Sequence, residues 1–367
     1  MNRQANSVLS SSDDLPIRTS SKVHSGKVRS VYFLTPEDSR RLIAQRGYAI
    51  HPESELAVMV ISDRLSAFDC LWRSRSLQGV PGKGAALNAI AAHWFRSFDG
   101  AGLMSHHLLE SPHPMLWVVR QARPVKIEAI ARRYLTGSLW RAYAQGERRV
   151  GGVELPEGMQ RYARFDELLF TPSTKGVIRG VEGVPETDDA PVDPSIVRSH
   201  AEHFALPDSG ALEALVVALE GGFELIEAAL AKRGELLVDT KFEFGVAPGL
   251  SGQSELIYMD EVGTPDSSRI WRRDDWQAGR PREYSKEQFR EALLNWVPDR
   301  QLLLDAKRMS ERAAFAREAS LPDAMFEELA STYRNQAESI TGNSLTVSDR
   351  PREEMLDVVS GELGLVI

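Results

Sequence analysis

Alternating polar and apolar positions are clearest at residues 238–245, which read Val-Asp-Thr-Lys-Phe-Glu-Phe-Gly. Side chains in a strand alternate between its two faces, so Asp239, Lys241 and Glu243 are predicted to share one face. The opposite face suits a protein core, with Val238, Thr240, Phe242 and Phe244. Because buried unpaired charge is heavily penalised, the charged face indicates side chains that bind a ligand or pair with one another.

An apolar segment at 255–262 follows a turn rich in Pro, Gly and Ser, and it predicts the second strand of a hairpin. Strict alternation lets Asp260 or Glu261, but not both, face the charged side. A carboxylate there, near Glu243, would add a second oxygen ligand of the kind that Mg²⁺ takes when it also holds phosphates. The next segment, Pro-Asp-Ser-Ser-Arg at 265–269, joins turn formers and hydroxyls to a guanidinium and suits an anion. A surface hairpin with solvated charges is the alternative.

The remaining periodicity predicts an α+β chain. Extended segments are predicted at 28–34, 57–62, 117–120 and 125–130. Helices are predicted at 38–45, 84–98, 138–146, 194–206, 209–233, 286–296, 299–318 and 322–341. Ser285 and Gln288 form a capping box for one of them. Residues 171–194, rich in Pro, Gly, Thr and acids, predict a long irregular loop that binds or covers a ligand.

The chain is long enough for two domains, since one hydrophobic core rarely exceeds about 300 residues. We expect a flexible tail at 1–21, a small sheet domain at 22–123, a larger α+β domain at 124–343 and a C-terminal extension at 344–367. The boundary is placed at Arg123-Pro124, between two extended segments.

A helix start beside two arginines adds a second candidate site. Ser138 is predicted as the N-cap of the helix that stops at Gly146, so the free N–H groups of the first turn would face a nearby anion. Arg132 and Arg133 lie close by in the sequence. A Ser that only caps the helix is the alternative.

The composition limits the ligands that the protein can bind and the compartment in which it is expected. The formal net charge of −8 over 367 residues argues against general nucleic-acid binding. The single cysteine, Cys70, excludes an internal disulfide and is expected to be a packed thiol in a strand. The sequence shows neither a membrane-length apolar run nor a secretory signal, so we expect a cytoplasmic protein. Assembly into a homo-oligomer stays open.

Six segments together resemble one known family. They are Gly26-Lys-Val-Arg29, Ser62-Asp-Arg-Leu-Ser-Ala-Phe-Asp69, Tyr134-Leu-Thr-Gly-Ser138, Phe170-Thr-Pro-Ser-Thr-Lys175, Asp239-Thr-Lys-Phe-Glu-Phe-Gly245, and Asp260-Glu261 with Pro265-Asp-Ser-Ser-Arg269. Their order is that of the SAICAR synthetases of purine biosynthesis, and the likeness covers about residues 22–343. The segments at 239–245 and 265–269 are the most specific parts of this resemblance.

The resemblance implies an ATP-dependent ligase with magnesium. Such an enzyme joins L-aspartate to the carboxylate of 5-aminoimidazole-4-carboxyribonucleotide (CAIR), through an acyl phosphate, to give SAICAR, ADP and phosphate. The implied fold is a small N-terminal β-rich domain over a larger α+β domain, with an ATP-grasp-like or kinase-like cleft. Adenine would lie against residues 120–125.

The resemblance also implies roles for individual residues. ATP would be held by Lys27, Arg29, Lys175, Lys241 and Glu243, and Mg²⁺ by Glu243 and Asp260. Substrates would contact Asp63, Arg64, Ser66, Asp69, Arg132, Ser138, Asp266 and Arg269. Lys241 and Asp239 would be catalytic.

One departure from the family pattern keeps alternatives open. The loop after Lys175 normally carries a His-Asp pair, and here the corresponding place reads Thr187-Asp188. A related ligase that uses another carboxylate or amine is therefore a second hypothesis. A nucleotide-binding regulator without catalysis is a third, and the intact set of charged residues argues against it.

Overall fold

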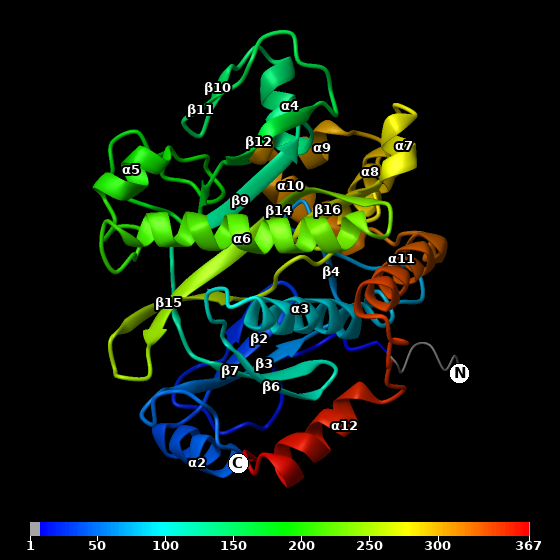
Figure 1. The fold of residues 1–367 in the computed structure, drawn as a ribbon. Helices are drawn as coiled ribbons and strands as arrows, with labels where there is room; N and C mark the ends of the chain where they lie inside the picture. The colour runs from blue at the N-terminus through cyan, green and yellow to red at the C-terminus, as the bar shows by residue number, and fades with distance from the viewer. Residues whose placement is uncertain (1–7, 367) are drawn as a thin grey trace. The chain divides into compact units, whose positions relative to one another are not determined.

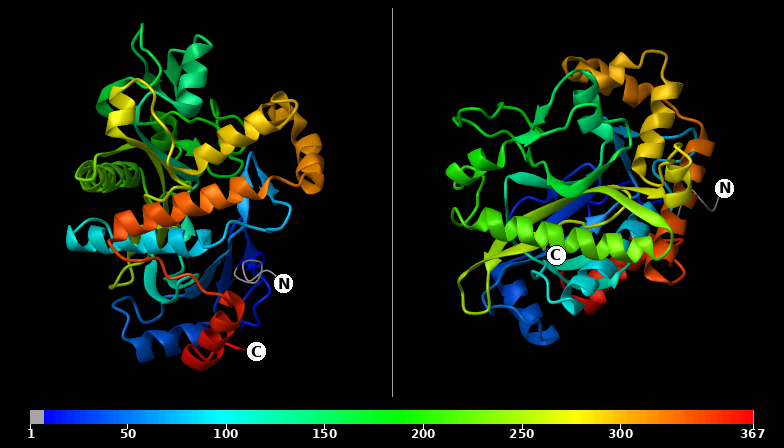
Figure 2. Two further views of the ribbon diagram at one scale, coloured as in Figure 1. Left: turned by 90° about the vertical axis from the view of Figure 1, so that its right-hand side faces the viewer. Right: turned by 45° about the horizontal axis from the view of Figure 1, so that its top comes forward.

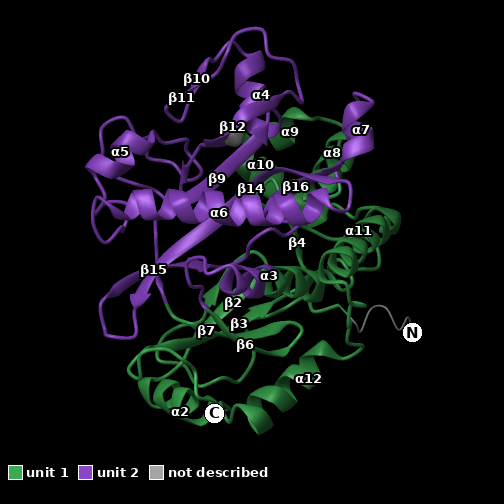
Figure 3. Cartoon of the chain, viewed as in Figure 1, with its two compact units in different colours: residues 1–93, 108–121, 284–367 green, residues 94–107, 122–283 purple. Residues whose placement is uncertain are grey.

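A computed structural model describes residues 8–366 of the chain. The chain forms two compact units (Figure 3). Unit 1 comprises residues 1–93, 108–121 and 284–367, and unit 2 comprises 94–107 and 122–283. The boundary expected at 123 lies next to the observed one at 121. The C-terminal helices differ from the expected division, because residues 284–343 group with unit 1.

Unit 1 is built on a five-stranded antiparallel sheet of order β1-β2-β3-β7-β6 (Figure 1). The strands are β1 (His24–Ser25), β2 (Arg29–Phe33), β3 (Leu56–Ile61), β6 (Leu108–His113) and β7 (Leu116–Arg120). All six residues of the central β3 are buried, as expected for a strand whose run is entirely apolar. A separate hairpin joins β4 (Leu65–Ala67) to β5 (Cys70–Trp72), where Cys70 is buried as predicted.

Local sequence signals explain the helices of unit 1. Helix α2 (Pro36–Arg46) begins after Thr35, which accepts a hydrogen bond from the Asp38 backbone N–H, and ends at Gly47 in the left-handed conformation. Ser285 is the N-cap of α8 (Lys286–Trp296), as predicted, but the capping box is not formed, because the Gln288 side chain bonds to Glu328 and Thr332. The other helices are α3 (Lys83–Gly100, in unit 1 up to His93), α9 (Gln301–Leu304), α10 (Met309–Glu318), α11 (Asp323–Thr341) and α12 (Pro351–Asp357).

Unit 2 is built on a seven-stranded sheet. Its main path is β12-β9-β14-β15, with β13 pairing with β9, and β8 and β16 pairing with β14. The strands are β8 (Arg123–Pro124), β9 (Ile127–Tyr134), β12 (Arg164–Phe170), β13 (Ser173–Thr174), β14 (Glu235–Pro248), β15 (Ser254–Met259) and β16 (Ser268–Arg272). Helix α6 (Ala211–Ala231) lies along one face of this sheet (Figures 1 and 2). The hairpin predicted from the sequence is β14–β15, with Glu243 opposite Met259.

The two ends of the described chain meet within unit 1. Ile17 forms an antiparallel bridge with Val366, and Leu9, Leu15 and Ile17 are buried. The expectation of a tail with little to bury does not fit the described residues from 8 onward, because these apolar side chains reach the core. Residues 1–7 lie outside the described part.

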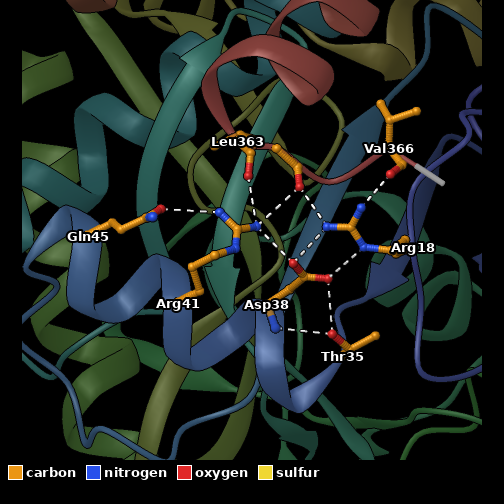
Figure 4. A network of polar contacts seen from close by, with 8 residues as sticks. Arg18, Thr35, Asp38, Arg41, Gln45, Leu363 and Val366 are labelled. Atoms are coloured by element: carbon orange, nitrogen blue, oxygen red, sulfur yellow. Dashed lines mark hydrogen bonds and ion pairs between the residues drawn. The ribbon is translucent and has the colours of Figure 1, made fainter.

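Two arginines fasten the C-terminal segment to α2 (Figure 4). The buried carboxylate of Asp38 accepts hydrogen bonds from Arg18 Nη2 at 2.9 Å and Arg41 Nη2 at 2.8 Å. Both arginines also donate to backbone carbonyls of the C-terminal segment, Arg41 to Leu363 at 3.0 Å and Arg18 to Gly364 at 2.6 Å. The extension predicted at 344–367 is therefore a docked part of unit 1 over its described length.

Across residues 8–366, none of the helices combines the length and hydrophobicity that a bilayer span requires.

Candidate active site

Strand β14 carries the charged face that the sequence predicts. Phe242 and Phe244 are buried and contact the ring of Tyr258, whereas Asp239, Lys241 and Glu243 form ion pairs. The alternation predicted for this strand is confirmed. Partners for the charges come from the two neighbouring strands and from one loop.

Asp239 holds two arginines, one from each neighbouring strand. In the sheet register Asp239 stands opposite Arg132 of β9 and Arg269 of β16. Its Oδ2 atom accepts from Arg269 Nη1 at 2.7 Å and from Arg132 Nη1 at 3.2 Å. The Asp239 carboxylate therefore fixes two guanidinium groups side by side, and its catalytic role stays a prediction.

Further contacts complete this arginine pair. Arg132 Nε donates to Thr171 Oγ1 at 2.8 Å, and Arg132 Nη2 donates to Ser138 Oγ at 3.4 Å. Gly137, with φ +58°, lies so close to Arg269 that a Cβ atom would meet its Nη2 at 2.8 Å. Two guanidinium groups with a hydroxyl beside them form an arrangement that binds phosphate or carboxylate.

The N-cap of the helix predicted at 138–146 lies two residues before the predicted Ser138. Helix α4 spans Gly137–Ala144, and its N-cap is Thr136, so Ser138 lies inside the first turn. Gly137, the first residue of α4, has a left-handed φ that glycine adopts readily, and the Trp140 N–H bonds to the Thr136 carbonyl at 3.1 Å. The expected nearness of Ser138 to Arg132 is confirmed by their hydrogen bond.

Lysines and glutamates alternate beyond Asp239 on the same face. Lys241 Nζ lies 2.5 Å from Glu128 Oε1 of β9 and 3.1 Å from Glu243 Oε1. Lys175, which follows β13, pairs with the other oxygen of Glu243. Four charged side chains thus form one chain of ion pairs, Glu128–Lys241–Glu243–Lys175, that we call the Lys–Glu row.

Burial and neighbouring charges shift the pKa values of the two lysines in opposite directions. Burial by itself lowers the pKa of Lys241, but the charges of Glu243 and Glu128 raise this pKa well above its usual range. The pKa of Lys175 is also raised, because Glu243 outweighs the effect of burial. Burial raises the pKa of Glu128 despite the nearby Lys241. Both lysines are therefore cations at neutral pH, as a site for phosphates requires.

The loop after Lys175 is tied to residues 187–190. Asp188 Oδ1 accepts from the Gly176 N–H at 2.6 Å, and Thr174 Oγ1 donates to the Thr187 carbonyl at 3.0 Å. The Thr187-Asp188 pair that departs from the family pattern therefore contacts both neighbours of Lys175: the Asp188 carboxylate binds the Gly176 N–H, and the Thr187 carbonyl accepts the Thr174 hydroxyl. The loop predicted at 171–194 is largely irregular, with β13 and the start of α5 (Pro194–Ser199) inside it.

Asp260 and Glu243 have the chemistry of magnesium ligands. Asp260 follows β15 in a left-handed conformation, φ +59°, and its charge raises the pKa of both Lys175 and Lys241. Within residues 8–366 no group of three or more His, Cys, Asp or Glu side chains could hold a metal ion by itself. Mg²⁺ commonly takes one or two carboxylates and completes its shell with water and phosphate oxygens, so the two residues fit that mode of binding. Asp266 lies in the turn between β15 and β16, where its N–H donates to Thr264 Oγ1 at 3.3 Å.

Unit 1 carries the other predicted residues. Lys27 forms an ion pair with Asp69, and both side chains are about half exposed. Asp69 and Phe68 form the two-residue turn between β4 and β5, with φ of +63° and +50°. Such turns usually take Asn or Gly, so this pair stores backbone strain of the kind that gathers at functional sites. Arg29 lies over the ring of Trp117 at 5.5 Å.

Three more predicted substrate residues of unit 1 are largely buried. Asp63 is fully buried, and its two carboxylate oxygens accept the backbone N–H groups of Leu9 and Gly84. Arg64 donates to the carbonyl of Gly26, next to Lys27, at 3.1 Å. Ser66 is buried within β4. In unit 1 these contacts give Asp63 and Arg64 an anchoring role, and the contact of Asp63, Arg64 and Ser66 with a substrate stays a prediction.

Comparison with known proteins decides the family. A family profile described as SAICAR synthetase matches residues 22–301. The chain belongs to the SAICAR synthetase family. It is 51% identical over 363 residues to a phosphoribosylaminoimidazole-succinocarboxamide synthase of Vibrio vulnificus and 50% identical over 364 residues to one of Shewanella piezotolerans, with 99% of each chain covered.

Solved structures of SAICAR synthetases share the fold. A SAICAR synthase of Saccharomyces cerevisiae in complex with SAICAR has a TM-score of 0.63 at 23% identity, covering 90% of this chain and 96% of that one. A SAICAR synthetase in complex with ADP has a TM-score of 0.56 at 17% identity, covering 88% and 99%. The predicted SAICAR synthetase-like α+β fold is thereby confirmed.

Glu128 was missed by the sequence analysis. Residues 126–132 alternate, with Ile127, Ala129 and Ala131 buried and Lys126, Glu128, Ile130 and Arg132 on the other face. The same period of two that singled out β14 would have placed Glu128 on the face of Arg132, with Ile130 between them. Within this SAICAR synthetase, Glu128 is the partner of Lys241 that the motifs did not reveal.

Proposed function

We propose that the protein joins L-aspartate to the carboxylate of CAIR with consumption of ATP, giving SAICAR, ADP and phosphate. One observation supports this most directly: two groups of charged side chains meet on the charged face of β14. The first is the arginine pair, Arg132 and Arg269 held by Asp239, which we call the anion grip, and the second is the Lys–Glu row. Membership of the family and full-length relatives with that name point to the same reaction. They also weigh against a related ligase with other substrates.

The two halves of the face suit the two phosphate-bearing substrates. In our proposal Arg132, Arg269 and Ser138 bind the ribonucleotide, because paired guanidinium groups offer several N–H donors in fixed directions. Lys175 and Lys241 neutralise the ATP phosphates. A solved family member was obtained in complex with ADP, which supports a nucleotide site in this fold.

The chemistry needs little covalent help from the protein. The CAIR carboxylate oxygen attacks the γ-phosphorus, ADP leaves, and an acyl phosphate forms. The amine of aspartate, once it has lost its proton, then attacks the carbonyl carbon and expels phosphate, which forms the amide bond. Catalysis of such steps rests on positioning and on neutralising the charge of the transferred group. Mg²⁺, when bound with ATP, would screen the phosphate charge, and Glu243 and Asp260 are the residues that would hold it.

Lys27 and Arg29 of unit 1 are proposed as further ATP contacts. Their cationic side chains lie at the entrance of β2 and within it, and the exposed Lys27 can exchange Asp69 for a phosphate. Asp69 and Asp266 remain proposed substrate contacts. The cytoplasmic address and the absence of a nucleic-acid partner stay predictions.

A coupled assay tests the proposal. Purified protein is supplied with Mg²⁺, ATP and CAIR, with L-aspartate present or omitted, and released phosphate and product mass are followed. We expect phosphate release that depends on aspartate, together with the mass of SAICAR. Binding of ATP without any succinocarboxamide product would reject CAIR or aspartate as the substrate and would favour the related-ligase hypothesis.

A further inference from the structure

Glu128 lies within the Lys–Glu row but has no role in the function proposed above. It stands on β9, where Ala129 pairs with Phe242 of β14, so Glu128 and Glu243 come next along the two adjacent strands. The Glu128 side chain is 16% exposed. Two neighbouring carboxylates in a buried setting repel each other unless a cation separates them.

Lys241 is that cation. Its Nζ atom lies 2.5 Å from Glu128 Oε1 and 3.1 Å from Glu243 Oε1, so one ammonium group bridges two strands. Glu243 in turn is shared, because its second oxygen pairs with Lys175. Of the two carboxylates, Glu128 lies nearer to the Lys241 ammonium group. Glu243 also pairs with Lys175, so its negative charge is shared between two lysines.

The difference between Glu128 and Glu243 as partners of Lys241 matters when the nucleotide binds. Here the inference rests on the proposed function, in which Glu243 binds the Mg²⁺ that accompanies ATP. A carboxylate that turns toward a metal gives up part of its hold on the lysines. Lys241 has a long flexible side chain, and fixing it on one target costs rotamer entropy unless another group holds it.

We propose that Glu128 is the positioning residue for Lys241: it holds the ammonium group at the phosphate site when Glu243 is engaged elsewhere. Glu128 then acts through Lys241 and touches neither substrate. Removal of such supporting partners commonly costs ten- to a hundredfold in affinity or activity.

A double-mutant cycle tests this role. Glu128→Gln, Lys241→Met and the double variant are compared with the parent enzyme in kcat, in KM for ATP and CAIR, and in the dissociation constant for ATP at fixed free Mg²⁺. We expect Glu128→Gln to weaken ATP binding and lower kcat by about tenfold or more, with KM for CAIR within twofold. In the Lys241→Met background the same substitution should change ATP binding by less than twofold.

Glu227→Gln is the matched control. Glu227 is also a carboxylate that pairs with a cation of β9, since its Oε1 lies 3.2 Å from Arg133 Nε, and it has no contact with Lys241 among the described ion pairs. It should leave the kinetic constants unchanged. Melting temperatures of all variants separate loss of function from loss of fold. Glu128→Asp keeps the charge on a shorter side chain and should restore part of the ATP affinity that Glu128→Gln loses.

The outcomes are distinct. An equal loss from Glu128→Gln in both backgrounds would overturn the positioning role, because the residue would then act independently of Lys241. So would parental kinetics in Glu128→Gln. Failure of the parent enzyme to make SAICAR would instead reject the proposed reaction, and the ATP dissociation constants would still decide the role of Glu128.

Discussion

Arg269 Nη1 donates to Asp239 Oδ2 at 2.7 Å across two neighbouring strands. The same oxygen accepts from Arg132 on the other side of β14, so one carboxylate sets the spacing of two guanidinium groups. Both arginines are held by the sheet register, which is more rigid than a loop. An anion that binds there meets N–H donors already in place, so little conformational entropy is lost on binding.

Replacing Arg269 with Lys should weaken binding of the ribonucleotide. A lysine ammonium cannot both pair with Asp239 and present a planar fork to a phosphate. We expect KM for CAIR to rise about tenfold or more, with KM for ATP within twofold, measured by steady-state kinetics. Arg133→Lys is the control, because Arg133 pairs with Glu227 and not with Asp239. An effect confined to ATP would show that Arg269 is misassigned.

Replacing Glu243 with Gln should raise the concentration of free Mg²⁺ that the enzyme requires. The amide keeps the size of the carboxylate but loses the charge that attracts the metal and both lysines. We expect activity at limiting Mg²⁺ to fall at least tenfold, with partial recovery when Mg²⁺ is in excess. The measurement is a titration of activity against free Mg²⁺ at saturating substrates. Near-normal turnover at limiting Mg²⁺ would remove Glu243 from the metal site.

Asp63 should make stability depend on pH. Complete burial raises the pKa of Asp63 from 3.8 to about 6, so between these values the folded state holds a proton that the unfolded chain has lost. The contribution of Asp63 to the free energy of unfolding therefore falls as the pH rises from about 4 to 6, and between pH 5 and pH 7 it falls by roughly 1 kcal/mol. Urea unfolding of the parent and of Asp63→Asn measures this. The free-energy difference, parent minus variant, should be larger at pH 5 than at pH 7, and a pH-independent difference would contradict the shift.

Replacing Asp38 with Asn should loosen the C-terminal segment. The Asp38 carboxylate is 6% exposed and holds both Arg18 and Arg41, which in turn hold the backbone at residues 363–366. We expect a loss of about 1–2 kcal/mol in the free energy of unfolding and faster amide hydrogen exchange near residue 365.

Glu53→Gln is the control for Asp38→Asn. Glu53 pairs with Arg40 on the same helix, but both side chains are more than half exposed, so its loss should cost less than about 0.5 kcal/mol. Unchanged exchange at residue 365 in Asp38→Asn would show that the apolar contacts of this segment hold it without the arginines.

The parts of the fold that the sequence predicted are those with a strong local signal. The alternation in β14, the turn before β15 and the Ser285 cap all depend on neighbours within a few residues, so they could be located without knowledge of the rest. Likewise the specific charged motifs placed Arg132, Arg269, Lys175 and Lys241 on one unit.

What could not be predicted depends on contacts between distant segments. Asp63 carries a motif charge but is fully buried, where it accepts the Leu9 N–H, and Asp239 pairs with two arginines from other strands. The N-terminal segment is mostly polar, yet Leu9, Leu15 and Ile17 are buried, and the Ile17 backbone pairs with that of Val366 at the other end of the described chain. Contacts between side chains that are distant in the sequence depend on the topology of the fold and cannot be inferred from the local pattern of residues.

The pairing of residue 17 with residue 366 also bears on the order of synthesis. Unit 1 is made from both ends of the described chain, whereas unit 2 is almost continuous, from 122 to 283 with one short earlier segment. On the ribosome the main part of unit 2 is complete about eighty residues before the segment that closes unit 1 has emerged. The sheet that carries Arg132, Asp239 and Arg269 can therefore form while Arg18 and Arg41 still lack their carbonyl partners at residues 363–366.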